Sequence, residues 1–379
     1  MTLRRGAEHT LMIHYFDSPD SSGRQPLATS DFEMATDGPF AAALGNVAGD
    51  GSNGLAVWRA GGGPDGTGSV LELYRLGTSA APESLTNCSI PVPHGWPADA
   101  AVLVGDVDPS SSADEIVLGG AGNRPRVYGR TADGALGALG VVSPEPRGAV
   151  SRGPVTFALA HTVPATERPG LQIVAGNSHG RVYVFGLDRG RFSRLALFNA
   201  FGGDATRSAN RLAVGDLLPN HPGEEIAVAD DGTRGDGLVR VFDGRTGSLL
   251  IEFQAFDPGE APDGVQLWVG DVVSWLPGAE LIVGQGRAGG LLRVLTMWSG
   301  VPVHVADVPD PLHRSSSLQS DVALGSLIPG LPGWQLAVAQ PDGAIPVQVF
   351  DMNARDPQLW SSVSVSDATD SIGAIAAEP

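Results

Sequence analysis

Carboxylates are the side chains of this chain best suited to chemistry, but their spacing argues against catalysis. The 379 residues include 42 Asp and Glu against 24 basic residues, which gives a formal net charge of -18. Acidic pairs such as Glu224-Glu225 and Asp230-Asp231 are adjacent in sequence. Adjacent residues of a strand point to opposite faces, so the two acids of a pair cannot share one proton. We therefore expect these acids to form a solvated rim.

Other catalytic and metal-binding patterns are absent from the sequence. It contains no G-x-S-x-G nucleophile elbow, no H-E-x-x-H zinc motif and no Lys, which excludes lysine Schiff-base chemistry. The 8 His residues are scattered without metal-ligand spacing. Cys88 is the single cysteine, so no disulfide can form within the chain. The sequence predicts no catalytic residues.

Two features are candidates for ligand binding. Trp275 and Trp334 fall in predicted turns, where an indole ring can stack on a sugar. Arg234-Gly235-Asp236 matches a tripeptide that many integrin ligands display, and it lies in a Gly-rich connection. Each feature also has an ordinary explanation, because Trp commonly packs between elements and a three-residue match arises easily by chance.

The charge of the chain limits its partners. A net charge of -18 repels phosphate backbones and anionic lipid, so nucleic-acid binding is disfavoured. No segment approaches the length of a membrane span, and the N-terminal residues lack the apolar stretch of a signal peptide. We expect a soluble chain with a protein or glycan partner and no membrane insertion.

The elements that position these residues recur at a fixed interval. A short segment of small and apolar residues occurs six times along the chain. Each copy contains one Gly or Ala that we call the anchor residue: Gly45, Gly105, Ala160, Gly215, Gly270 and Gly325. After a first interval of 60 residues the spacing is 55, which marks one supersecondary unit used repeatedly. In the fourth unit, RLAVGD, EIAVA, LVRVFD and SLLIEFQAF are typical of four antiparallel strands. Such units arranged radially form a β-propeller.

We therefore predict an all-β fold, a seven-bladed β-propeller of four-stranded antiparallel blades that forms a single domain over residues 1–379. Blades 1 to 6 are expected near 37–95, 96–150, 151–206, 207–261, 262–316 and 317–370. The seventh blade is split, with residues 371–379 as its inner strand and residues 1–36 as the rest. This sharing closes the ring, removes a sheet edge and favours a monomer. Because MTLRR is polar, the split blade has either three or four strands.

The repeating unit resembles a known family. The pattern of the unit is two apolar residues, Gly-Asp, a polar turn and then Glu/Asp-Ile-Val-Val-Gly. This order is similar to the FG-GAP repeat of integrin α-subunit propellers and related bacterial propellers, and the resemblance covers essentially the whole chain. The family includes adhesion domains, lectins, assembly scaffolds and a few polysaccharide-acting enzymes, so the resemblance implies a fold more than a function. It also favours an extracellular or cell-surface location.

The resemblance implies a calcium site. In that family the turn between the first two strands often carries D-x-D-x-D-G-x-x-D, and its oxygens bind Ca²⁺. The best match is DVDPSSSADE, with candidate ligands Asp106, Asp108, Ser110, Ser112 and Asp114. Ser110 replaces a carboxylate and Ser111 replaces the usual Gly, so one weak site is expected. The alternative is a solvated Asp/Ser turn without metal.

The remaining turns match the calcium pattern less well. In NVAGDGSNG, Asn46 and Asp50 are a weaker candidate pair of ligands. LLPNHPGE, VVSWLPGAE, LIPGLPGWQ and TVPATERPG have Pro-Gly and apolar residues at ligand positions, which indicates turns that are held by backbone rigidity.

These observations together favour a non-enzymatic binding or assembly scaffold that presents propeller loops to a protein or glycan partner, with one structural Ca²⁺. A carbohydrate-binding lectin that uses Trp275 or Trp334 is the first alternative. The second is a polysaccharide hydrolase or lyase with carboxylates at the mouth of the central channel.

Overall fold

The computed structural model describes most of the chain. The described residues are 2–5, 10–16, 29–35, 40–60, 69–76, 82–92, 101–120, 123–131, 133–142, 155–204, 207–209, 211–230, 236–257, 259–261, 264–286, 291–309, 321–327, 331–339, 347–353, 357–363 and 371–375. For some of these residues the description covers the backbone alone, namely 2–5, 10–16, 29–35, 86–92, 123, 155, 309, 321, 339, 347, 360–363 and 371–375.

Six blades each consist of four consecutive antiparallel strands in this part of the chain. Blade 1 contains β4 (Phe40–Gly45), β5 (Gly54–Ala60), β6 (Ser69–Arg75) and β7 (Glu83–Val92). Blade 2 contains β8 (Ala101–Gly105), β9 (Glu115–Gly120), β10 (Asn123–Arg130) and β11 (Leu136–Val141). Blade 3 contains β12 (Val155–Ala160), β13 (Gln172–Asn177), β14 (Arg181–Asp188) and β15 (Arg191–Asn199).

The other three blades follow the same order. Blade 4 contains β16 (Arg211–Gly215), β17 (Glu225–Ala229), β18 (Leu238–Asp243) and β19 (Leu249–Gln254). Blade 5 contains β20 (Val265–Gly270), β21 (Glu280–Gln285), β22 (Leu291–Thr296) and β23 (Val303–Pro309). Blade 6 contains β24 (Asp321–Gly325), β25 (Gln335–Ala339), β26 (Val347–Asp351) and β27 (Gln358–Val363).

A further sheet, the terminal sheet, joins the two ends of the chain. Its order is β28 (Ser371–Ile375), β1 (Thr2–Arg5), β2 (Thr10–Phe16) and β3 (Thr29–Ala35), with β1 paired antiparallel to both β28 and β2. The polar N-terminal segment therefore does form a strand. We predicted seven blades; six consist of consecutive strands, and the role of the terminal sheet as a seventh remains a proposal.

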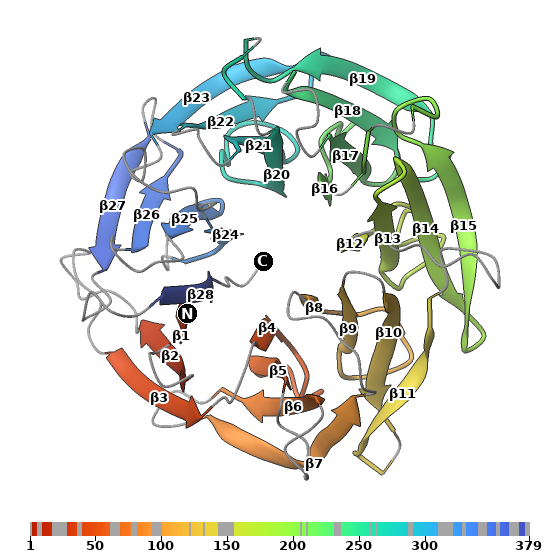
Figure 1. The fold of residues 1–379 in the computed structure, drawn as a ribbon, viewed down its shortest axis with the longest axis vertical. Helices are drawn as coiled ribbons and strands as arrows, with labels where there is room; N and C mark the ends of the chain where they lie inside the picture. Colours follow the sequence, from red (N-terminus) through yellow and green to blue (C-terminus); the bar gives the residue numbers. More distant parts are fainter. Residues whose placement is uncertain are drawn as a thin grey trace.

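The sheets are arranged around a central axis (Figure 1). The first strand of each blade, together with β28, lies nearest the centre, and the fourth strand lies at the periphery. Strand β28 contacts the inner strands β24 and β4 of the flanking blades. The β-propeller architecture and the four-stranded antiparallel blades predicted from the repeat are therefore confirmed.

Burial along the strands explains their residue types. The second strand of a blade is covered by a neighbouring blade on each side, so β9, β13 and β17 are buried along their whole length, and after a polar first residue they are mainly small and apolar. The fourth strands β15 and β19 have one solvated side and carry many exposed residues. Composition thus follows radial position.

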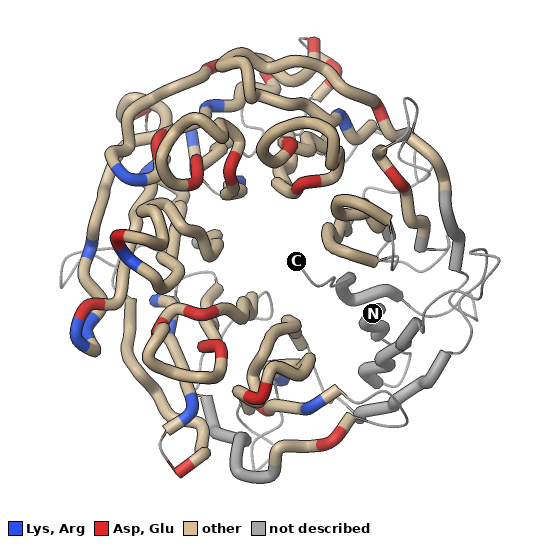
Figure 2. Tube along the Cα trace, turned by 180° about the vertical axis from the view of Figure 1, so that it is seen from behind, with Lys and Arg blue, Asp and Glu red and all other residues tan. Residues whose placement is uncertain are grey.

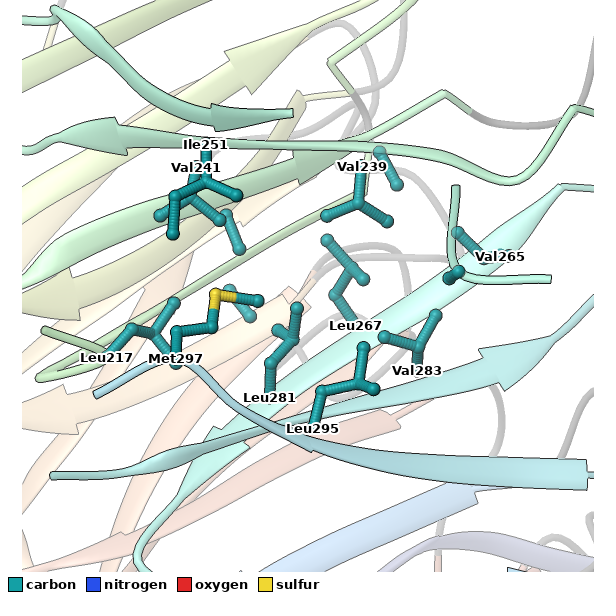
Figure 3. Packing of buried hydrophobic residues seen from close by; sticks show 14 of the residues in the cluster. Leu217, Val239, Val241, Ile251, Val265, Leu267, Leu281, Val283, Leu295 and Met297 are labelled. Atoms are coloured by element: carbon teal, nitrogen blue, oxygen red, sulfur yellow. The ribbon is translucent and has the colours of Figure 1, made fainter. Parts of the chain in front are cut away.

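The hydrophobic core is divided among the junctions between neighbouring blades. Five clusters of buried residues each contain side chains from two consecutive blades. At the junction of blades 4 and 5, Val239 and Val241 of β18 lie above Leu281 and Val283 of β21 (Figure 3). Stability of the ring therefore depends on how closely each blade can approach the next.

The anchor glycines permit this close approach. A Cβ atom on Gly105 would lie 2.8 Å from Leu159 Cδ1, and one on Gly215 would overlap with Val269 Cγ1. In both cases the obstructing side chain belongs to the inner strand of the next blade. The repeated small residue is thus a requirement of packing between blades.

We predict that Gly215→Ala lowers the free energy of unfolding by about 1–3 kcal/mol, because the new methyl group overlaps with Val269. Val269→Ala removes the obstruction, so the double variant should lose less stability than the two single losses added together. Chemical denaturation of all four proteins measures this coupling. Strictly additive losses would contradict the proposed contact.

We predict that deletion of residues 371–379 lowers the melting temperature by at least about 5 °C, because β1 loses its pairing with β28. Deletion of residues 376–379 alone leaves β28 in place and serves as the matched control. Differential scanning calorimetry compares the two truncated chains with the full one. Equal melting temperatures for all three would show that the terminal sheet does not hold the ring.

Candidate functional site

One face of the ring carries two sets of turns from every blade. Antiparallel strands return to the same end after each second strand, so the first-to-second and third-to-fourth turns share a side, which we call the turn face. Contacts between blades confirm this. Arg245 of blade 4 pairs with Glu167 of blade 3 at 2.8 Å, and Ser274 N of blade 5 donates to Asn353 Oδ1 of blade 6 at 2.9 Å.

A backbone hydrogen bond on the turn face joins each pair of consecutive blades. The carbonyl of the residue after the anchor accepts from an amide in the first turn of the next blade. The five bonds run from Asp114 N to Asn46 O (3.0 Å), Leu171 N to Asp106 O (2.7 Å), Glu224 N to His161 O (2.9 Å), Ala279 N to Asp216 O (2.7 Å) and Trp334 N to Asp271 O (2.7 Å). We call each bond a blade joint.

A buried acid or amide follows each joint donor, and we call it the joint residue. The five joint residues, at most 1% exposed, are Glu115, Gln172, Glu225, Glu280 and Gln335. Each begins a second strand and pairs with the anchor residue of its own blade. In blade 1 this position is Gly54, which pairs with Gly45.

The joint residues hold the turn that carries the donor. Glu280 Oε2 accepts hydrogen bonds from the amides of Val272 and Val273, both at 3.0 Å. Glu115 Oε2 likewise accepts from Val107 N at 3.0 Å and Asp108 N at 2.7 Å. These bonds fold the start of the turn back on the second strand and so fix the position of the joint donor.

Burial changes the acidity of the joint glutamates. It raises the pKa of Glu115 to about 7 and the pKa of Glu225 and Glu280 to about 8, although backbone hydrogen bonds act in the opposite direction. We expected the pair Glu224-Glu225 to lie on a solvated rim, and this was wrong for Glu225, which is fully buried. Asp230 of the second acidic pair is also buried, at 4% exposure.

The residues of the predicted calcium turn serve mainly the joint between blades 1 and 2. Asp114 Oδ2 accepts from Asn46 N at 2.8 Å, and the Ser112 carbonyl accepts from Asn46 Nδ2 at 3.1 Å. Asp108 Oδ1 accepts from the amide and hydroxyl of Ser110 within the turn. Both candidate calcium turns thus contact each other across one junction.

Asp106 is the exposed carboxylate of the predicted ligand set. Burial, followed by the charges of Asp114 and Asp108, raises its pKa, while His161 acts in the opposite direction. Three neighbouring carboxylates therefore share this turn. Among the described residues, however, no group of three or more His, Cys, Asp or Glu side chains has a geometry that could hold a metal ion.

The weaker calcium candidates form a local turn. Asn46 Oδ1 accepts from the amides of Gly49 and Gly51, both at 3.0 Å. Asp50 accepts from Ser52 N at 3.0 Å and pairs with Arg75 at 2.8 Å. Hydrogen bonds from Ser52 lower the pKa of Asp50. Both side chains already have partners within their own blade.

Carboxylates follow the inner strands around the centre of the turn face. Asp216 and Asp271 follow the anchors of blades 4 and 5, and burial raises the pKa of each. No cationic side chain in the described part of the chain lies within ion-pair distance of either. Acidic segments occur on turns of several blades around the ring (Figure 2). This region can attract cationic groups.

The two predicted tryptophan candidates differ in their surroundings. Trp275, in the first turn of blade 5, is 62% exposed. Trp334 packs against Leu324 and Gly270 at the junction of blades 5 and 6 and is partly buried. Trp334 therefore has the structural role that the sequence left open, whereas most of the Trp275 side chain is exposed.

The RGD tripeptide is only partly described. Arg234 and Gly235 lie outside the described residues, and Asp236 forms a two-pronged ion pair with the guanidinium of Arg207. Hydrogen bonding to Arg207 lowers the pKa of Asp236. Since Arg207 is only 8% exposed, Asp236 belongs to a structural network.

Sequence reasoning missed two groups of residues. The joint residues carry a signal, because Pro-Gly-x-Glu or Pro-Gly-x-Gln ends the first turn of blades 3 to 6. The second group is a set of exposed apolar residues on the turn face of blade 5, namely Trp298 and Val301 in the third-to-fourth turn and Val303 at the start of β23. No pattern distinguishes these three residues from core positions in the sequence.

Comparisons with known proteins support the fold alone. No protein-family model matches the chain, and no curated protein matches it in sequence. The FG-GAP resemblance therefore remains a proposal. None of the described residues forms a helix that is long and apolar enough to cross a lipid bilayer.

Solved β-propeller structures are similar to the chain. Raptor from Chaetomium thermophilum has a TM-score of 0.59 at 11% identity, over 91% of this chain and 26% of that one. Sqt1 from Saccharomyces cerevisiae has a TM-score of 0.54 at 11% identity, over 89% of this chain and 77% of that one. Chaetomium thermophilum Sqt1 bound to the N-terminus of the ribosomal protein L10 has a TM-score of 0.50 at 18% identity, over 86% of this chain and 75% of that one. The C-terminal WD40 domain of Sif2 has 0.50 at 14%, over 90% of each chain. At these identities the shared property is the propeller fold.

Proposed function

We propose that this protein is a non-enzymatic scaffold that binds a protein partner through the turn face of blade 5. The observation that carries this proposal is a set of four exposed apolar residues on the turn-face side of one blade, which we call the blade 5 patch: Trp275, Trp298, Val301 and Val303 are 62%, 46%, 56% and 44% exposed. Large exposed apolar residues on one face are typical of interaction sites, and Trp contributes much of the binding energy of many interfaces.

Charge indicates the chemistry of the partner. The chain has a net charge of -18, and Asp216 and Asp271 follow the inner strands on the same face as the patch. A protein segment that combines an apolar side chain with Arg or Lys would complement both features. The apolar side chain supplies buried area, and the basic residues accelerate encounter and fix orientation.

The comparisons are compatible with this role. A structure of Sqt1, a propeller similar in fold, contains the N-terminus of the ribosomal protein L10. The identity of 18% limits this argument to the scaffold, so neither the partner nor its binding site is transferred.

We predict that peptides selected for binding from a random displayed library are enriched in basic and apolar residues. Trp298→Ser combined with Val301→Ser should weaken binding of a selected peptide by about tenfold or more, because two exposed apolar contacts are lost. Fluorescence anisotropy with the purified variants measures this change in Kd.

The matched control uses exposed apolar residues on the outer strands. Val141→Ser combined with Leu197→Ser should leave the affinity unchanged, since these exposed residues lie near the ends of the fourth strands β11 and β15 that are remote from the turn face. If the control variant loses binding and the patch variant keeps it, the patch is not the docking surface. Selection of acidic peptides would contradict the charge argument.

A lectin is the alternative that Trp275 still supports, because its indole is exposed enough to stack on a sugar ring. Trp334, the other candidate, packs between blades and offers little free surface. Glycan-array binding that is lost with Trp275→Ser would favour this alternative over the protein-binding scaffold.

We also propose that the chain is a divergent FG-GAP propeller, with the terminal sheet as its seventh blade and one weak calcium site at the turn of Asp106 to Asp114. Support comes from the three carboxylates of that turn, because the negative charges of Asp114 and Asp108 raise the pKa of Asp106 beyond the effect of burial and a bound cation would offset them.

We predict that Ca²⁺ raises the melting temperature of the protein and that Asp108→Ala removes this effect. Asp114→Ala should destabilise the protein both with Ca²⁺ and with EDTA, because the amide of Asn46 loses its acceptor. Differential scanning fluorimetry separates the two outcomes. An unmutated protein that melts at the same temperature in Ca²⁺ and in EDTA would refute the calcium site.

A further inference from the structure

The joint residues are of two chemical types at equivalent positions. Blades 3 and 6 have Gln172 and Gln335, whereas blades 4 and 5 have Glu225 and Glu280. Each begins the second strand, pairs with its anchor and is fully buried. An amide and a carboxyl group have nearly the same shape, but only the amide always has a donor. The two types can therefore be compared atom by atom.

The glutamine joints show what this position requires. Gln335 Oε1 accepts from Leu327 N at 2.8 Å, and its Nε2 donates to the Gly333 carbonyl at 2.9 Å. Gln172 repeats the arrangement, with Oε1 accepting from Val163 N and Nε2 donating to the Gly170 carbonyl. In both blades one side-chain atom accepts and the other donates to the residue two positions earlier.

Glu280 makes those hydrogen bonds of this arrangement in which the side chain is the acceptor. Its Oε2 accepts from Val272 N and Val273 N, both at 3.0 Å. Its Oε1 is buried and has no hydrogen-bond partner among the described residues. The carbonyl two positions earlier belongs to Gly278, the counterpart of Gly333, and both glycines have positive φ angles, of 84° and 71°. A proton on Oε1 would supply the donor that Gln335 has.

The surroundings of Glu280 disfavour a negative charge. Asp271 is the charged group acting on Glu280 from the adjoining turn, and its negative charge opposes ionisation. Burial has the larger effect and raises the pKa of Glu280 to about 8. Glu225 differs because His221 Nδ1 lies 3.1 Å from its Oε1, while Asp216 opposes its ionisation as Asp271 does for Glu280. Glu280 is therefore the cleaner case.

We propose that Glu280 is a neutral carboxylic acid in the folded protein at neutral pH, that it donates to the Gly278 carbonyl as a glutamine would, and that its ionisation in alkaline solution loosens the joint between blades 4 and 5. That joint is the bond from Ala279 N, the residue between Gly278 and Glu280, to the Asp216 carbonyl at 2.7 Å. The joints with Gln172 and Gln335 do not titrate. The ring thus contains pH-sensitive and pH-insensitive joints.

The direction of the pH effect follows from linkage. The ordinary pKa of Glu is 4.5, and the folded value is about 8, so the folded state retains a proton that the unfolded chain has lost between these limits. The contribution of Glu280 to stability is therefore complete below about pH 4.5, decreases as the pH rises, and is lost above about pH 8.

Reciprocal substitutions test the proposal. Glu280→Gln should leave the melting temperature nearly unchanged at about pH 5 and raise it by about 2–4 °C at about pH 9. Gln335→Glu in blade 6 should have little effect on the melting temperature at the lower pH and should lower it at the higher pH. Glu83→Gln, at an exposed carboxylate, controls for the change in net charge and should show no such pH dependence.

Two results would overturn the proposal. The first is a Glu280→Gln variant whose melting temperature changes equally, or not at all, at both pH values. The second comes from infrared spectroscopy of the unmutated protein, which does not depend on the folding of any variant. A buried protonated carboxyl gives a carbonyl band that should be present at neutral pH and vanish in alkaline solution, and its absence at neutral pH would refute a neutral Glu280.

Discussion

A single backbone hydrogen bond at each junction between blades constrains much of the described structure. The carbonyl that follows an anchor can reach the next blade only if the two inner strands lie close together, which explains why Gly105 and Gly215 face side chains of the following blade. The donor amide must also be held still. The buried joint residue does this by binding the backbone of its own turn.

This constraint also accounts for the polar residues of the turn face. Asp114 stands at a predicted calcium-ligand position, yet its carboxylate accepts a hydrogen bond from the backbone of the neighbouring blade. Glu224 of blade 4 does the same for His161 N of blade 3. Polar side chains that resemble ligands in the sequence thus satisfy backbone groups, whereas the exposed apolar residues of blade 5, the surface proposed for partner binding, take no part in these bonds.

The repeat period predicted the blades well, because four short strands with small residues at one end have few other ways to pack. Side-chain roles were harder to predict. Glu224 and Glu225 are adjacent in the sequence. Glu225 is buried because it begins β17 between two blades, whereas Glu224, in the turn before it, stays partly exposed. Trp334 and Asp236 similarly acquire their partners from other segments, Gly270 and Arg207, which no local pattern reveals.

The central claim is that the blade joints hold the ring, and native-state hydrogen exchange tests it most directly. If the claim is correct, the joint donors Leu171, Ala279 and Trp334 exchange only through unfolding of the whole ring, as slowly as amides in the buried strand β17. Exchange of these three amides by local opening, while β17 stays protected, would show that the joints are incidental and that apolar packing alone holds the blades together.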